Sequence, residues 1–207
     1  MFRLILSELR HHIPFTATGA ASGIILMAII VFSNTLLQVS QVSHTIFYIL
    51  HPLHVVLSAL VTTALYRKHG KGKLWAAILI GYFGSVGIAT ISDSIIPYLG
   101  ERLLDLPYTA PHIGFIEEWQ IVNPAAVIGI AIGYWKPVTE VPHFGHVLLS
   151  TWASLFHIIM ALGETISWGI YLVIFVFLFL SVWLPCCLSD IVFPLLFIRK
   201  AARQESH

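Results

Sequence analysis

Two eight-residue segments of this chain, HPLHVVLS beginning at His51 and HFGHVLLS beginning at His143, share one pattern of histidines. Each has a second histidine three residues later, His54 and His146, and then a valine, a leucine and a serine at matching positions. Side chains three residues apart lie on one face of a helix, so both imidazoles of a pair can reach the same ion. We therefore predict that each pair contributes two ligands to a metal site.

Two further motifs recur in the same order along the chain. The segment SDSIIPYL, which contains Asp93, matches SDIVFPLL, which contains Asp190. The segment HIPF, which begins at His12, matches HIGF, which begins at His112. The three pairs of motifs are separated by 92, 97 and 100 residues. Three matches in one order indicate an internal duplication of the chain.

The composition indicates an integral membrane protein. Of the 207 residues, 57% are hydrophobic and 10% are charged, and the mean hydropathy is +0.87. Soluble domains carry about 25% charged residues, so this chain has too few polar groups to cover a single large core. The formal net charge of +1 provides no basic surface for nucleic acid. We expect the lipid bilayer as a partner and no nucleic acid.

The apolar residues fall into segments long enough to cross a bilayer, which requires about 20 residues per helix. Six spans are predicted, at about 16–38, 45–66, 74–99, 120–135, 142–162 and 168–198. Ahead of them, residues 2–13 place apolar side chains at helical spacing with polar ones opposite. This pattern predicts a short amphipathic helix on the membrane surface.

The lysines and arginines predict the orientation of the chain. With six spans, ten of the eleven positive residues lie on one side of the membrane, and only Arg102 lies on the other. Positive residues concentrate on the cytoplasmic side of membrane proteins. Both termini are therefore predicted to be cytoplasmic, and we expect a prokaryotic cytoplasmic membrane.

Three helices are an odd number, so the second half must be inserted upside down relative to the first, as in inverted-repeat transporters. The predicted fold is an all-α integral membrane protein with six transmembrane helices, arranged as two inverted three-helix repeats and preceded by the short amphipathic helix. The first repeat spans 1–106 and the second spans 107–207. In this arrangement His51, His54 and Asp93 lie toward the outer face, and their counterparts lie toward the cytoplasmic face.

The repeated residues indicate the kind of metal. Two or three imidazoles with one carboxylate suit zinc, iron, manganese, cobalt or nickel, whereas magnesium and calcium prefer oxygen ligands. The predicted metal ligands are His12, His51, His54, Asp93, His112, His143, His146 and Asp190. Predicted extra ligands, or hydrogen-bond partners of the ligands, are Ser58, Ser150, His157, Glu164, Glu117, Glu118 and Cys186. The remaining histidines, including His44, are expected at the surface, and no nucleotide cofactor is expected.

Placement of one His/Asp group toward each face favours a membrane transporter for a divalent transition metal cation. An ion would enter a site from one side and leave from the other, and protons displaced from histidine would couple to its movement. The chain is short for a transporter, so a homodimer formed through its glycine stripes is a further expectation.

Other function classes fit the same residues. A metal-dependent intramembrane enzyme of the hydrolase type would use one His/Asp site to activate water. A haem-binding electron carrier would use His51 or His54 with His157 as axial ligands, but would leave the aspartates unexplained. A non-catalytic subunit of a larger membrane complex would leave the repeated polar residues without a purpose.

Overall fold

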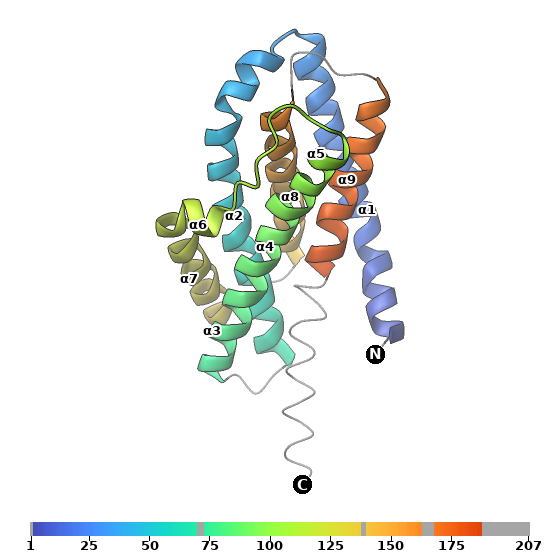
Figure 1. The fold of residues 1–207 in the computed structure, drawn as a ribbon. Helices are drawn as coiled ribbons and strands as arrows, with labels where there is room; N and C mark the ends of the chain where they lie inside the picture. The colour runs from blue at the N-terminus through green and yellow to red at the C-terminus, as the bar shows by residue number, and fades with distance from the viewer. Residues whose placement is uncertain (1, 70–72, 138–139, 163–167, 188–207) are drawn as a thin grey trace.

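The computed structural model (Figure 1) describes residues 2–69, 73–137, 140–162 and 168–187. Within these ranges, the side chains of 2–9, 11–12, 15, 69, 140–143, 168 and 186–187 lie outside the description. The described residues are mainly helical, with no strand among them. The long elements are α1 Phe2–Phe32, α2 Leu36–His69, α7 Trp119–Trp135, α8 Glu140–Ala161 and α9 Trp168–Cys187.

The segment from 74 to 103 forms one continuous rod with two π-helical turns. Its parts are α3 Leu74–Tyr82, η1 Phe83–Gly87, α4 Ile88–Thr90, η2 Ile91–Ile95 and α5 Ile96–Leu103. A non-helical connection then leads to the one-turn helix α6 Gly114–Glu117. In Figure 1 this connection crosses the bundle from α5 to α6.

The helices have the length and composition of a membrane protein. Within the described residues, three helical stretches are long and apolar enough to cross a bilayer: Leu36–Lys68, Leu74–Leu103 and Phe144–Ala161. Thr16–Phe32 and Gly169–Pro185 are shorter apolar helices. The prediction of an all-helical chain with apolar membrane-type helices is therefore confirmed at this coarser level.

The N-terminal residues differ from the expected arrangement. Residues 2–13 are helical, but they continue without a break into the next segment, so that α1 is a single helix of 31 residues with Pro14 inside it. One proline removes one backbone hydrogen bond, and no glycine or asparagine stop signal follows it before Gly19. The separate amphipathic helix is therefore not seen. The turn to α2 comes at Asn34, which has a positive φ of 56°.

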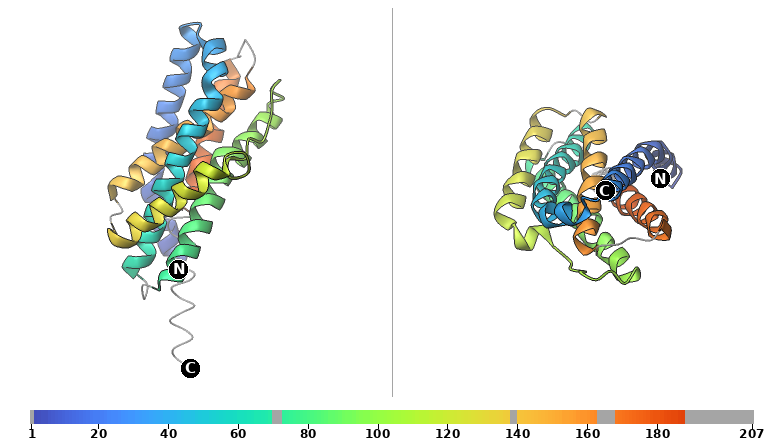
Figure 2. Two further views of the ribbon diagram at one scale, coloured as in Figure 1. Left: turned by 90° about the vertical axis from the view of Figure 1, so that its left-hand side faces the viewer. Right: turned by 90° about the horizontal axis from the view of Figure 1, so that it is seen from above.

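Helix α2 lies at the centre of the fold. It packs on α7 and on α8, while α1 packs on α9 and α8 (Figures 1 and 2). Close approach of α2 and α7 depends on glycine, because a Cβ at Gly129 or Gly133 would overlap the carbonyl oxygens of Val56 or Leu60. Small residues commonly allow such approach between membrane helices.

The glycine stripes expected to support a homodimer are used within the chain. Gly129 and Gly133 face α2, and a Cβ at Gly19 would lie 2.9 Å from the Thr151 hydroxyl oxygen in α8. A Cβ at Gly81 would meet the side chain of Ile130 in α7. The homodimer stays a prediction, but Gly19, Gly81, Gly129 and Gly133 are already covered by neighbouring helices.

The α2–α7 contact gives a stability prediction. Gly129→Ala should lower the thermal unfolding midpoint in detergent, because the added methyl group meets a backbone carbonyl that cannot rotate away. The expected cost is about 1–3 kcal/mol, as for overpacked cores. Gly87→Ala is the matched control, because no atom lies within 4 Å of a Cβ built there. Equal midpoints for the two variants would contradict the close approach.

Candidate functional site

Asp93 sits in a π-helical turn that buries three successive polar residues, Ser92, Asp93 and Ser94. Pro97 is the second residue of the following α-helical segment and has no N–H to donate. In the i→i+5 pattern of η2, that missing donor would have paired with the carbonyl of Ser92. The Ser154 hydroxyl of α8 donates to this carbonyl instead, over 3.0 Å. The turn is therefore tied to α8 at the point where its own backbone pairing is interrupted.

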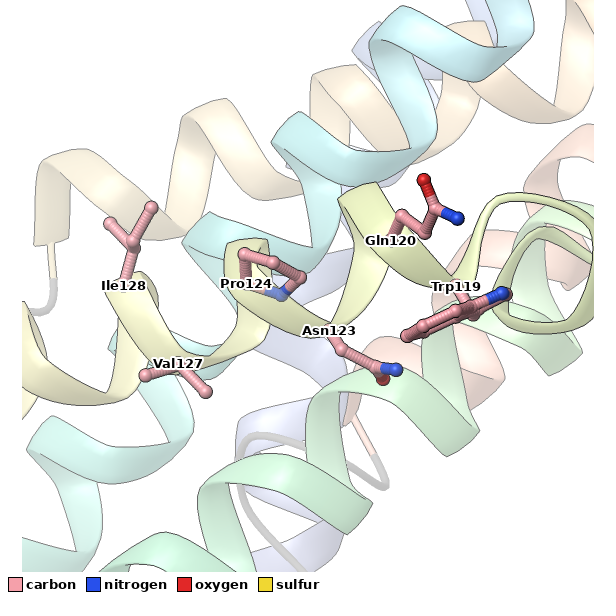
Figure 3. Close-up of a pocket in the computed structure, with 6 residues that line it drawn as sticks. All are labelled: Trp119, Gln120, Asn123, Pro124, Val127 and Ile128. Carbon is pink, nitrogen blue, oxygen red and sulfur yellow. The ribbon is translucent and has the colours of Figure 1, made fainter.

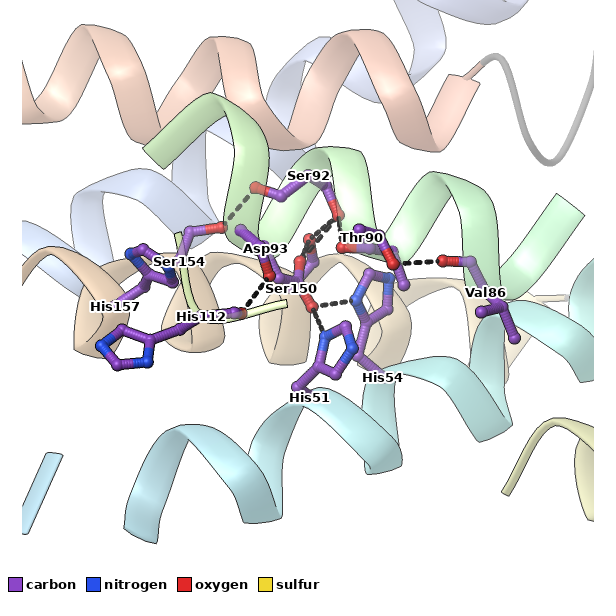
Figure 4. A network of polar contacts seen from close by, with 12 residues as sticks. His51, His54, Val86, Thr90, Ser92, Asp93, His112, Ser150, Ser154 and His157 are labelled. Carbon is purple, nitrogen blue, oxygen red and sulfur yellow. Dashed lines mark hydrogen bonds and ion pairs between the residues drawn. The ribbon is translucent and has the colours of Figure 1, made fainter. Parts of the chain in front are cut away.

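One oxygen of Asp93 binds both histidines of the first His-x-x-His motif (Figure 4). His51 Nδ1 lies 2.9 Å and His54 Nδ1 lies 2.6 Å from Asp93 Oδ2. An ionised carboxylate only accepts hydrogen bonds, so each ring is assigned with its proton on Nδ1. The Nε2 atom of a neutral ring then presents a lone pair, which is the arrangement in which carboxylates orient metal-binding histidines.

The other oxygen of Asp93 accepts two hydroxyl groups. Ser92 donates to Oδ1 over 2.7 Å, and Ser150 of α8 donates over 2.8 Å. Asp93 thus receives four hydrogen bonds from α2, η2 and α8, and the whole residue is buried. Ser150, predicted as a hydrogen-bond partner of the ligands, is placed in this role.

The buried group has the donor atoms that a borderline divalent cation requires. His51, His54 and Asp93 each offer one ligand atom, and these atoms lie within 4.8 Å of one another. Within the described residues, His51 Nε2 and His54 Nε2 are buried without a hydrogen-bond partner, and so is the Ser58 hydroxyl. A buried imidazole nitrogen with no partner is costly, so these atoms favour a bound ligand.

His146, from the second His-x-x-His motif, lies beside the first motif rather than at a distant face. Its ring centroid is 4.6 Å from that of His54, in an edge-to-face arrangement, and it is fully buried. Since Ser150 of the same helix also reaches Asp93, the described parts of both motifs meet at one place. This differs from the expectation of one group near each face.

Several predicted site residues lie outside the described part of the chain. These are Glu164 and Asp190 as whole residues, and His12, His143 and Cys186 as side chains. Their place relative to the buried group stays a prediction.

His157 forms a second buried pair, with Glu101 of α5. Its Nδ1 lies 2.6 Å from Glu101 Oε1, and its Nε2 lies 3.2 Å from the carbonyl oxygen of Pro111. Because a carbonyl can only accept, Nε2 carries a proton, and one further proton lies between Nδ1 and Glu101. His157 therefore ties α5, α8 and the connection before α6 together, and it is not part of the Asp93 group.

His112 and Glu117 meet at the surface, with two residues of α2. His112 Nδ1 lies 3.5 Å from Glu117 Oε2, and the Tyr48 hydroxyl donates to the same oxygen. The His44 ring packs against Tyr48 and His112, with centroid distances of 4.6 Å and 5.6 Å. Partial burial would raise the pKa of Glu117, but the hydrogen bonds from Tyr48 and His112 outweigh it and lower that pKa. Glu118 is outside the group of ligand atoms gathered here.

Some residues near the site were not predicted from the sequence, although they belong to rows of residues at helical spacing on α8 and α2. On α8 the buried polar residues His146, Ser150, Ser154 and His157 recur at steps of four, four and three. On α2 the residues His44, Tyr48 and His51 follow the same spacing. A search for polar residues at helical spacing around each motif would have included Ser154, His44 and Tyr48. Nothing in the sequence indicated Glu101 as the partner of His157.

A hollow of about 510 Å³ lies on the surface of α7 (Figure 3). It is lined by Trp119, Gln120, Asn123, Pro124, Val127 and Ile128. The residues of α7 that pack inward are others, such as Val122 and Ala126. The hollow therefore faces away from α2 and from the Asp93 group, and none of the residues of that group lines it.

Known proteins provide no relative from which the site could be interpreted. No family model, curated protein or solved structure matches the chain.

The His157–Glu101 pair gives a second stability prediction. Glu101→Ala should lower the thermal unfolding midpoint, because it leaves His157 Nδ1 buried without a partner, at a cost of about 1–3 kcal/mol. Glu101→Gln should lie close to wild type, because its amide N–H can donate to the same nitrogen. Equal destabilisation by the two substitutions would contradict the proton placement inferred here.

Proposed function

We propose that this chain is an integral membrane transporter for a divalent transition metal cation, held in transit by His51, His54 and Asp93 with His146 beside them. The observation that supports this most is the shared carboxylate oxygen of Asp93, which orients two fully buried imidazoles whose Nε2 atoms have no described partner. A buried group inside an apolar bundle can bind an ion and release it again, as a transport site must.

The charge of the group suits a cation. Asp93 is negative and the histidines are neutral when they donate one proton each, so the buried group carries a net charge of −1 in this assignment. A divalent ion would change that net charge to +1, and it would supply the missing partner of the imidazole nitrogens. Imidazole nitrogens oriented by a carboxylate favour zinc, iron, manganese, cobalt or nickel, whereas magnesium and calcium prefer oxygen ligands.

The proposed function includes a membrane topology for the chain. Six spans would include α1, α7 and the segment around α9, in addition to the three longer apolar stretches. The chain would consist of two inverted repeats with both termini cytoplasmic, and each repeat would contribute one His-x-x-His motif. The contact between His54 and His146 supports one central path with ligands from both halves, in place of two separate sites.

An intramembrane metalloenzyme is the second candidate. The specific observation that favours it is that the described ligands form one group, as an enzyme requires, and that the group lies next to a π-helical turn, a feature frequent at functional sites. A metal bound tightly without movement across a membrane would favour this candidate.

The haem carrier is favoured least. Phe47 packs against both rings that it would need, with its centroid 5.4 Å from that of His51 and 5.3 Å from that of His157. Both ring nitrogens of His157 already have partners. Axial ligation would require breaking these contacts.

Metal flux in sealed vesicles tests the proposed function. Purified protein is reconstituted with a metal-sensitive dye inside, and Zn²⁺, Co²⁺ or Mn²⁺ is added outside. Wild type should show saturable flux of at least one of these ions, and Asp93→Asn should reduce the initial rate at least about tenfold, because it weakens the orientation of both imidazoles. Ser43→Ala is the control, because this buried hydroxyl of α2 donates only to the Val39 carbonyl of its own helix.

Two outcomes would overturn the transporter. One is a flux in the Asp93→Asn variant equal to that of wild type, which would show that the transported ion does not bind at the Asp93 group. The other is a purified protein that retains a transition metal by elemental analysis but moves none across the vesicle membrane. That result would favour the intramembrane metalloenzyme.

The Ser150 hydroxyl bond generates a further prediction. Ser150→Ala should weaken Zn²⁺ binding by about 10–100-fold, because it removes a donor that fixes the Asp93 carboxylate. Ser181→Ala is the matched control, since that buried hydroxyl donates to the Leu178 carbonyl within α9. Binding is measured by competition with a chelator of known affinity. Equal affinities of the two variants would contradict a role for Ser150 in positioning Asp93.

A further inference from the structure

We propose that His44, His112 and Glu117 form a second, surface-accessible site for the same class of cation, from which an ion passes to the buried group. The proposal that these residues bind a cation is based on their geometry. The passage to the buried group rests on the proposed function.

The three side chains offer two imidazoles and one carboxylate from separate elements. His44 comes from α2, His112 from the connection before α6, and Glu117 from α6 itself. One ligand atom from each lies within 4.8 Å of the others. Two histidines and one carboxylate with positions open to water form a common donor set for zinc and other transition metals. His44 and Glu117 are exposed, so water or bulk ions can reach this set.

The backbone holds His112 in an unusual conformation toward this group. Its φ is +32°, in a region that non-glycine residues rarely adopt and that costs about 1–3 kcal/mol. The Ser94 hydroxyl fixes the residue by donating to the His112 carbonyl oxygen over 2.9 Å. Since Ser94 follows Asp93 directly in η2, the position of His112 is tied to the turn that carries the buried group.

A structural ion pair explains the convergence poorly. The His112–Glu117 contact is long, at 3.5 Å, and the two side chains are 25% and 41% exposed. Exposed pairs of this kind contribute about 0–1 kcal/mol to stability. The hydrogen bond from Tyr48 accounts for the position of Glu117, and ring packing brings His44 against Tyr48 and His112, but neither contact requires three ligand atoms to converge. A cation bound between the three residues would explain all of them.

The surface site and the buried group are neighbours along α2. His51 follows His44 by seven residues, or two turns, which corresponds to about 10 Å of helix and the same face. Tyr48 lies between them on that face and donates to Glu117.

The segment of His112 also reaches the buried group, through Gly114. A Cβ added there would lie 2.7 Å from His51 Nε2. One segment of the chain thus contacts both sites, and a shift of α6 would change the surroundings of both.

Zn²⁺ binding to the full-length protein in lipid nanodiscs tests the surface site. Wild type should bind two ions per chain. His44→Ala/Glu117→Gln should bind one, with the affinity of the tighter wild-type site, and His51→Ala/His54→Ala should retain the weaker one. Asp105→Asn is the matched control, because it removes an exposed carboxylate from the same connection outside the cluster. Unchanged stoichiometry in His44→Ala/Glu117→Gln would overturn the site.

Flux measurements test the passage of the ion separately. In vesicles, His44→Ala/Glu117→Gln should raise the Zn²⁺ concentration for half-maximal flux at least about tenfold, with little change in the maximal rate, because uptake is weakened and the buried group is intact. Normal flux at low Zn²⁺ in this variant would overturn the uptake role. Absence of flux in wild type, with two ions still bound, would overturn the transporter and leave the surface site standing.

Discussion

Insertion of an ionised aspartate at the centre of a membrane helix costs roughly 2.5–3.5 kcal/mol, and Asp93 is fully buried within an apolar helical stretch. Four hydrogen-bond donors offset this cost: two imidazoles on one oxygen and two hydroxyls on the other. They come from α2, from α8 and from η2 itself. The need to keep these donors around one carboxylate holds three helices together at the same depth, and the other contacts of the site build on that arrangement.

The backbone around Asp93 is adapted to the same requirement. Pro97 leaves the Ser92 carbonyl without its backbone donor, and Ser154 supplies one from α8. On the opposite side of α2, Gly129 allows α7 to lie against the backbone at Val56. Helix α2 is thereby fixed between α7 and α8, which leaves His51 and His54 little freedom to turn away. Ligands on packed helices are held more rigidly than ligands on loops.

Composition and motif spacing predicted the helical, apolar character of the chain and the association of His51 and His54 with Asp93. Spacing gives the face of a helix on which a residue lies, but not which faces meet, so it could not show that His146 reaches His54 or that Ser150 reaches Asp93. Spacing also did not indicate that Ser154 of α8 would bond to the backbone of the π-helical turn. His44 was expected to be an ordinary surface residue, because its neighbours in space come from a distant connection.

The convergence of α2 and α8 on one carboxylate limits how such a protein can move. Asp93 is bound by α2 through imidazoles and by α8 through a hydroxyl, so α2 and α8 cannot separate at this depth without breaking bonds to it. A cation bound at the Nε2 atoms of His51 and His54 would leave these bonds in place, because they use the Nδ1 atoms and the carboxylate. In a transporter built on this centre, α2 and α8 would then stay joined at Asp93 while an ion is bound, and access to the ion would have to come from movement of other helices around this pair.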